Sequence, residues 1–474
     1  MTDVRDRTRG IGVLQGTALY VAAILGSGLL VLPGLAAAVA GPASILAVLA
    51  VMLLAAPLAG TFAALAARYP DPGGVASYVR RAIGPTAARA TGYWFYFGVA
   101  AGFPVLALLG GNYLTALTGV DASAAPLLGL AVLVPPFAIN MLGVRTAGWV
   151  QFVLTGTLTA IVVFVVGVAF PAVAPEHFVP LLPHGWAGVG VAVSLFVWAF
   201  AGWEVGTHIS DEFRNPRRAI PIATGIALVV TGAAYLLLQV VTVGVLGGAA
   251  GDSDAPLVAL AEAVAPGVGR VLVGVAAGIV ALGVLNSYLA AFGKLGASLA
   301  VTGDLPKMFA PGAEAGGVPR RALLLTFAVA LAYFGAAVAT GGNLETFILI
   351  HTGNMVSIYA AGMIAALRIL PRRTPGWWMA LVAAALSVLL LALNVSHLAP
   401  AALLAVAAVA VTLWRRRGAR RGGPGAAEAS LAAVSPLQPG MPGIDEVAPA
   451  VSPVQRQVPC VDSEGTTTPC TASA

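Results

Sequence analysis

The amino-acid sequence predicts an all-α membrane protein with about twelve transmembrane helices. Of its 474 residues, 59% are hydrophobic and only 9% are charged, and the mean hydropathy is +0.92. Because a soluble domain carries about 25% charged residues, this composition excludes that class. Apolar runs of roughly 20 residues recur from Gly10 to Trp414, each long enough to cross a bilayer. The runs are continuous Leu, Val, Ala and Gly without alternation, which favours helices over barrel strands.

The expected spans follow one another closely along the chain. The first run is near 30 residues, longer than a straight helix needs, which suits a helix interrupted at Gly26 and Gly28. We expect spans near 11–39, 43–66, 87–118, 125–142, 148–170, 186–209, 219–247, 268–300, 321–340, 344–368, 376–395 and 398–414.

The basic residues predict the orientation in the membrane. They gather in alternate loops and at the termini, whereas the intervening loops hold mainly acids and one basic residue, Arg270. Basic loops stay in the cytoplasm, so both termini are predicted to be cytoplasmic in a multi-pass protein of the cell inner (plasma) membrane. The net charge of +6 is explained by this topology, and no nucleic-acid partner is needed to account for it. The basic positions are Arg5, Arg7, Arg9, Arg68, Arg80, Arg81, Arg89, Arg145, Arg214, Arg217, Arg218, Lys307, Arg320, Arg321, Arg368, Arg372, Arg373 and Arg415 to Arg417.

The two ends of the chain differ in character from the spans. Residues 1–10 form a short polar cytoplasmic N-terminus, and residues 418–474 are rich in Gly, Ala, Pro, Ser and Thr without a period. This composition predicts a disordered cytoplasmic tail. Its two cysteines, Cys460 and Cys470, are expected to be free thiols on the reducing side of the membrane.

Gly26, Ser27 and Gly28 predict a break in the first span. Two glycines in three residues let the backbone leave helical geometry at low steric cost. The amide N–H groups freed at the start of the next half-helix then favour an anion such as a carboxylate, to which Ser27 could donate its hydroxyl. The alternative is a small-residue patch where another helix crosses closely.

A second break is expected in the sixth span, at Ala201 and Gly202. The carbonyl groups exposed there could accept from an ammonium group. The aromatic residues Trp198, Phe200 and Trp203 flank this break, and an aromatic face also favours a cation. Each aromatic could equally pack in the core or face lipid. Interrupted spans at corresponding places in two halves of a chain indicate a transporter's binding site.

Glu204 places a carboxylate inside the apolar sixth span. Charge in hydrocarbon is costly, so this group either pairs with a donor, stays protonated, or binds and releases a proton during function. His208 lies four residues on, on the same helical face, and is either its donor partner or an interfacial histidine.

Several motifs together resemble the amino acid–polyamine–organocation family of transporters. They are Gly26-Ser27-Gly28, the pattern Trp198-x-Phe200-x-Gly202-x-Glu204, and the segment Asp211-Glu212-x-Arg214-Asn215-Pro216-Arg217-Arg218-x-Ile220-Pro221. The resemblance covers roughly residues 10–415. Within the family, the chain is most similar to bacterial exporters of methionine and branched-chain amino acids.

The resemblance implies a five-plus-five inverted repeat with discontinuous helices 1 and 6. Spans 1–5 (about 11–170) and spans 6–10 (about 186–368) would form the transporter core of residues 11–368, followed by two additional spans in 369–417. The substrate site would lie between spans 1 and 6, with contributions from spans 3, 8 and 10. Its implied residues are Ile24, Gly26, Ser27, Gly28, Trp198, Phe200, Ala201, Gly202 and Trp203, with Glu204 for proton coupling.

Within that site, the family pattern assigns a role to each break. The first would hold the amino acid carboxylate and the backbone around Trp198 to Gly202 its ammonium group, while Trp198 closes over the substrate. Ala290 and Ala291 stand where sodium-coupled relatives carry hydroxyl residues, so no sodium site is expected there. No other metal and no cofactor are expected either. Lys294 in the eighth span is expected to snorkel to the interface.

The predicted pocket lining favours a neutral substrate. It is short and apolar, and no second acid stands in the spans to pair with a cationic side chain. The lining is predicted to include Ile24, Gly102, Phe103, Phe200 and Ala201, with Asn286 and Asn354 as polar additions.

The sequence therefore predicts a secondary active transporter, not an enzyme. It would export neutral, hydrophobic L-amino acids of the methionine, leucine, isoleucine and valine class, as a proton-coupled antiporter working by alternating access. The alternatives are an importer or exchanger of other amino acids, or a transporter-like sensor that signals through the tail. Its partners would be the amino acid, protons and the lipid bilayer, and its oligomeric state stays open.

Overall fold

The structure is a computed structural model, and it describes residues 10–26, 28–199, 202–251, 256–341 and 344–421, together with two short strands near the C-terminus. The chain divides into two units, Met1–Arg421 and Gly422–Ala474, each of which is described by itself. In the second unit, β1 (Cys460–Val461) pairs antiparallel with β2 (Thr467–Thr468).

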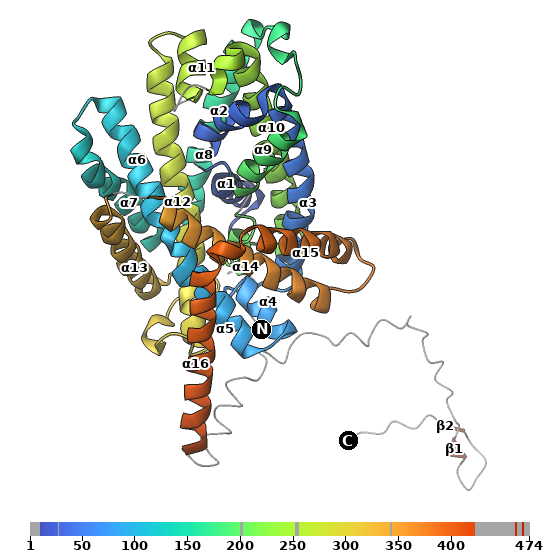
Figure 1. The fold of residues 1–474 in the computed structure, drawn as a ribbon. Helices are drawn as coiled ribbons and strands as arrows, with labels where there is room; N and C mark the ends of the chain where they lie inside the picture. Colours follow the sequence, from blue (N-terminus) through green and yellow to red (C-terminus); the bar gives the residue numbers. More distant parts are fainter. Residues whose placement is uncertain are drawn as a thin grey trace. The chain divides into compact units, whose positions relative to one another are not determined.

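The first unit is built from α-helices (Figure 1). Several are joined by short 3-10 turns, and a π turn at Trp94–Gly98 continues α5 toward α6. The helices are α1 (Val13–Ile24), α2 (Gly28–Ala40), α3 (Ser44–Arg68), α4 (Val75–Ala82), α5 (Pro85–Tyr93), α6 (Gly102–Thr118), α7 (Ala125–Met141), α8 (Val144–Ala169), α9 (Gly185–Ala199), α10 (Pro216–Leu246), α11 (Pro256–Val264), α12 (Gly269–Val301), α13 (Arg320–Ala339), α14 (Leu344–Ile369), α15 (Pro375–Leu393) and α16 (Ala399–Arg421).

Among the described residues, nine helical stretches are long and apolar enough to cross a membrane. Three further apolar helices are shorter, at Val13–Ile24, Ala125–Met141 and Gly185–Phe196. The predicted all-α membrane class is thereby confirmed, while the number of twelve spans stays a prediction. Two of the three short helices, α1 and the α9 segment, belong to the spans that were expected to be interrupted.

Helix α1 lies in the interior of the unit (Figure 1). It packs against α8, α10 and α12, and most of its residues are buried. A helix that is apolar on all faces is favoured inside a bundle. Its glycine and alanines allow close approach: a Cβ on Gly16 would lie 2.4 Å from the Phe213 ring.

The N-terminal end of α1 is tied to the segment that follows α9. Ile11 forms a parallel bridge with Phe213. The Ile11 N–H donates to the Glu212 carbonyl at 2.9 Å, and the Arg214 N–H donates to the Ile11 carbonyl at 3.2 Å. These bonds join the start of the first interrupted span to the end of the second, on the face that the pattern of arginines assigns to the cytoplasm.

A buried polar network fixes α12 against α7 and α8. Asn140 donates to the Asn286 side-chain oxygen at 2.9 Å, and Asn286 donates to the Gln151 side-chain oxygen at 3.0 Å. Ser287 also donates to Gln151, and Gln151 donates to Thr155 at 3.1 Å. Satisfied polar groups of this kind hold membrane helices in a defined register.

Candidate functional site

A cavity of about 720 Å³, open solvent at its mouth included, lies between α1, α2, α6, α12 and α14. The lining is almost entirely apolar, with Tyr288 and His351 as the side chains that carry polar groups. The lining residues are Ala23, Ile24, Gly26, Gly28, Val99, Gly102, Phe103, Val105, Leu106, Val284, Tyr288, Phe292, Ile348 and His351.

The first span is interrupted at the cavity. Helix α1 ends at Ile24, where the Leu25 N–H caps the Val21 carbonyl at 2.7 Å, and α2 begins at Gly28. Gly26 and Gly28 both line the cavity, so the break borders it as the sequence predicts. A Cβ on Gly26 would lie 3.3 Å from Val284, so a larger residue would crowd the wall. Ser27 lies outside the described residues.

At the second break, the backbone of Gly202 packs closely against the first span. Gly202 has φ +118°, a conformation that favours glycine, and a Cβ there would lie 3.1 Å from the Ala23 carbonyl oxygen. Its N–H donates to the Tyr359 hydroxyl at 3.0 Å. The two interruptions therefore meet at Ala23 and Gly202. Phe200, Ala201 and the side chain of Trp198 lie outside the described residues.

Glu204 is fully buried and is held by two tyrosines. The Tyr359 hydroxyl donates to one carboxylate oxygen at 2.8 Å, and the Tyr288 hydroxyl donates to the other at 3.5 Å. Because Tyr288 also lines the cavity, it connects Glu204 to that space, while Tyr359 connects it to the Gly202 break. The ion pairs found among the described residues do not include Glu204.

His208 was one candidate partner of Glu204, and the structure assigns that place to the tyrosines. Among the described side chains, those that hydrogen-bond the Glu204 carboxylate are Tyr288 and Tyr359. The His208 ring instead packs 4.4 Å from the Phe95 ring, between centroids. The sequence gives no signal for the two tyrosines, because each is one aromatic residue among many in apolar helices.

Trp203 is fully buried beside Tyr20, with 6.3 Å between ring centroids. The cavity lining found among the described residues does not include it. In this structure Trp203 therefore packs in the core against Tyr20.

The far wall of the cavity is formed by α6 and α14. Gly102 and Phe103 line it as expected, and Gly102 lets His351 approach: a Cβ there would lie 2.7 Å from the His351 Nδ1. The Nδ1 of His351 is 3.0 Å from the Val99 carbonyl, which can only accept, so this nitrogen carries the proton. Asn286 and Asn354, also expected here, are fully buried and lie outside this lining, where Asn286 joins the polar network and Asn354 donates to the Ile350 carbonyl at 2.8 Å.

Lys294 does not snorkel to the interface, so that expectation is wrong. Its side chain is fully buried and forms an ion pair with Glu212. The ammonium also donates to the carbonyls of Glu314 at 2.7 Å and Gly312 at 3.4 Å. The loop before α13 folds over the end of the lysine and supplies these acceptors, and its Gly316 N–H donates to Glu212 at 3.0 Å.

Asp211, the neighbour of Glu212, has a different environment. Its Oδ1 is buried without a hydrogen-bond partner among the described residues. Burial raises the pKa of this carboxyl to about 7; the nearby Lys294 ammonium opposes the shift, and Glu212 adds to it. Asp211, with its raised pKa, thus lies beside the Lys294–Glu212 ion pair.

Comparison of the sequence with known proteins gives a consistent result. A model of the family described as "Amino acid permease" matches residues 11–415. The "Uncharacterized amino acid permease YecA" of Bacillus subtilis (strain 168) is 30% identical over 380 residues, covering 79% of this chain and 88% of that protein. The "L-methionine/branched-chain amino acid exporter YjeH" of Escherichia coli (strain K12) is 29% identical over 394 residues, covering 81% and 91%.

Solved structures share the fold at low sequence identity. A Na⁺-coupled sialic acid symporter in a substrate-bound outward-open state aligns with a TM-score of 0.56 and 11% identity, covering 81% of this chain and 90% of that chain. MhsT in complex with L-phenylalanine aligns with a TM-score of 0.56 and 15% identity, covering 81% and 98%. These likenesses establish the fold alone.

Proposed function

The chain belongs to the amino acid permease family, and we propose that it is a secondary active transporter of neutral, hydrophobic L-amino acids that works by alternating access. In this proposal the amino acid binds where the two interrupted spans meet the cavity. The N–H groups at the start of α2 receive its carboxylate, and the backbone around Gly202 receives its ammonium group. The apolar wall takes its side chain.

The observation that carries a proton-coupled mechanism is the position of Glu204. Its carboxylate is buried, and no ion pair holds it among the residues that the structure describes. A charge in that place is costly in a membrane protein, and a bound proton removes the cost. Tyr288 connects this carboxylate to the cavity and Tyr359 connects it to the Gly202 amide, so its protonation state acts on groups at the binding site. Proton binding and substrate binding can therefore favour the same or opposite conformations, as coupling requires.

The substrate class is supported by the cavity wall. Phe103, Val105, Leu106, Val284 and Ile348 offer contacts to an aliphatic or thioether side chain. A cationic side chain would meet no carboxylate in this lining, which favours neutral substrates. One relative is named as an exporter of L-methionine and branched-chain amino acids, which supports both this substrate class and export. That export occurs by proton antiport is proposed on the position of Glu204 alone.

The proposal keeps the predicted organisation of the chain in the inner membrane. Two inverted repeats within 11–170 and 186–368 form the core, and residues 369–417 add two spans. Residues 1–10 and the tail 418–474 face the cytoplasm, as the positive-inside pattern favours.

Counterflow in proteoliposomes tests the proposal. Vesicles preloaded with unlabelled leucine or methionine should take up labelled amino acid, and a pH gradient should change the extent of uptake. Glu204→Gln should keep exchange at equal pH and lose the response to the gradient. Glu176→Gln, the same change at an exposed loop residue, should behave as the wild type. Wild-type pH dependence in Glu204→Gln would remove Glu204 from coupling, and binding without flux would favour a sensor.

A further inference from the structure

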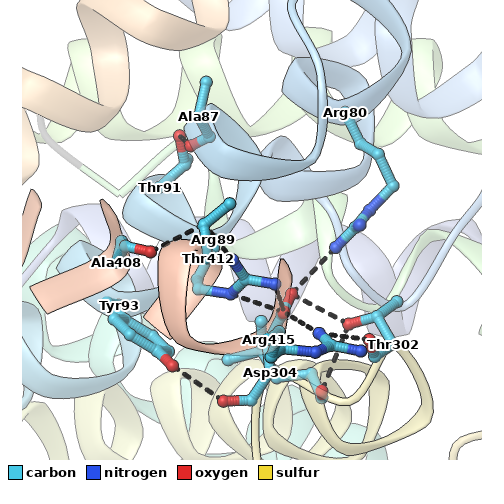
Figure 2. Close-up of polar contacts among 11 residues, drawn as sticks. Arg80, Ala87, Arg89, Thr91, Tyr93, Thr302, Asp304, Ala408, Thr412 and Arg415 are labelled. Carbon is cyan, nitrogen blue, oxygen red and sulfur yellow. Dashed lines mark hydrogen bonds and ion pairs between the residues drawn. The ribbon is translucent and has the colours of Figure 1, made fainter. Parts of the chain in front are cut away.

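Three arginines from separate helices converge on one carboxylate, that of Asp304 (Figure 2). The N···O distances are 2.9 Å from Arg80 in α4, 2.6 Å from Arg89 in α5 and 3.3 Å from Arg415 in α16. The Asp304 side chain is fully buried, and Tyr93 donates to its backbone carbonyl at 2.8 Å. We call Arg80, Arg89, Asp304 and Arg415 the Asp304 cluster.

The cluster carries more positive charge than its acid can neutralise. Three guanidinium groups face a single carboxylate, which leaves a surplus of two positive charges. Asp71, the other acid near Arg80, is shared with Arg81, so it does not remove this surplus. Like charges held this close repel one another, so an additional anion would stabilise the arrangement.

Two of the arginines have donors left for such an anion. Arg89 is buried and uses its Nε and Nη2 on Asp304 and its Nη1 on Thr412. Among the described contacts, Arg80 uses only Nη2 and Arg415 only Nη1, although each guanidinium carries five N–H groups. Their side chains are 31% and 41% exposed. Both bond the same carboxylate, so the two guanidinium groups lie close together.

The position of α16 indicates where that anion comes from. Along this helix Leu403, Val406 and Trp414 are 70%, 65% and 75% exposed, as expected of a helix at the lipid boundary. Trp414 directly precedes Arg415, and tryptophan next to arginine is typical of the headgroup level. With the predicted orientation, the cluster lies at the inner leaflet, whose anionic lipids attract basic groups.

We propose that Arg80 and Arg415 bind the phosphate of an anionic phospholipid headgroup, with Asp304 and Arg89 as the buried base of the site. The phosphate would accept paired N–H donors from both guanidinium groups. The lipid would thereby fasten α16 to α4 and α5. This site is separate from the transport cavity and does not depend on the transported substrate.

Thermal unfolding of the full chain in a neutral detergent tests the proposal. The probes are phosphatidylglycerol, phosphatidylcholine with the same acyl chains, and inorganic phosphate. We expect phosphatidylglycerol to raise the Tm well above the shift given by phosphatidylcholine, and inorganic phosphate to give no shift. Arg80→Gln and Arg415→Gln should each lose most of the phosphatidylglycerol increment. Arg417→Gln, the same change two residues away on α16, should keep it.

The increment, and not the absolute Tm, separates binding from a structural role. Arginines that only hold Asp304 would give variants with a lower Tm and an unchanged phosphatidylglycerol increment, which overturns the proposal. An equal increment with inorganic phosphate would assign the site to a free anion and overturn the lipid assignment. Native mass spectrometry should show phosphatidylglycerol retained by the wild type and Arg417→Gln, and lost from Arg80→Gln and Arg415→Gln.

Discussion

Replacing Lys294 by methionine should destabilise the protein severely, because it leaves Glu212 as a buried charge without its cation. Methionine has nearly the length of lysine, so the change removes the ammonium without opening a large cavity. Glu212 would keep the N–H of Gly316, at 3.0 Å, and lose its ion pair. The carbonyls of Gly312 and Glu314 would lose a donor as well.

The magnitude follows from these contacts. Removing one partner of a buried ion pair costs about 3–5 kcal/mol, and each carbonyl that loses its donor adds about 1 kcal/mol. Adding Glu212→Gln removes the stranded charge and keeps an acceptor for Gly316. The double variant should therefore recover part of the loss, with a coupling energy of about 2–3 kcal/mol.

Unfolding by dodecyl sulfate titration in mixed micelles measures the free energies of the wild type, the two single variants and the double variant. If Lys294 and Glu212 stabilise the fold as a pair, the double variant is more stable than the sum of the single losses predicts. Additivity to within about 0.5 kcal/mol would refute it, because Lys294 and Glu212 would then contribute independently.

Three further predictions concern Asp211, the second break at Gly202 and the cavity wall at Gly102. The folded pKa of Asp211, about 7, lies above its ordinary value of 3.8, so its contribution to stability is present at low pH and is lost as the pH rises toward 7. Asp211→Asn should accordingly raise the free energy of unfolding at pH 8, by up to about 4 kcal/mol, and with it the Tm, whereas at pH 4 both should change little. Tm curves of the wild type and the variant that run parallel against pH would contradict this. Gly202→Ala should strain the second break by about 1–3 kcal/mol and abolish amino acid flux in proteoliposomes, because of its φ of +118° and the nearby Ala23 oxygen. Gly225→Ala, at a helical position where a Cβ meets nothing, is its control and should transport normally. Gly102→Ala should displace His351 into the cavity and reduce uptake of methionine more than that of alanine, and an equal reduction would place this wall away from the substrate side chain.

The sequence predicts the two breaks and the buried acid well, because each departs from its surroundings. Glycines close together in an apolar run, as at Gly26 and Gly28, indicate an irregular backbone, and Gly202 has the positive φ that a break requires. Glu204 stands out because a carboxylate in a membrane span is expensive. These features are local, and a local pattern suffices to find them.

The partners of those groups are not local, and the sequence does not reveal them. Tyr288 and Tyr359 reach Glu204 from positions 84 and 155 residues away, on helices where many aromatic residues stand. Lys294 would snorkel if water lay above it, but the loop at Gly312 to Gly316 covers it. A long-range contact of this kind depends on how the helices pack, which apolar patterning leaves open.

The bridge between Ile11 and Phe213 couples two segments that belong to different predicted repeats, so that they are expected to move together. Its hydrogen bonds run from backbone to backbone, so substitutions other than proline at either residue leave the donors and acceptors in place. Truncating the chain beyond Ile11 would act differently, because it removes the bridge partner of Phe213. The segment after α9 and the start of α1 would then both lose these hydrogen bonds. An N-terminal truncation made for expression would therefore affect the second interrupted span as much as the first.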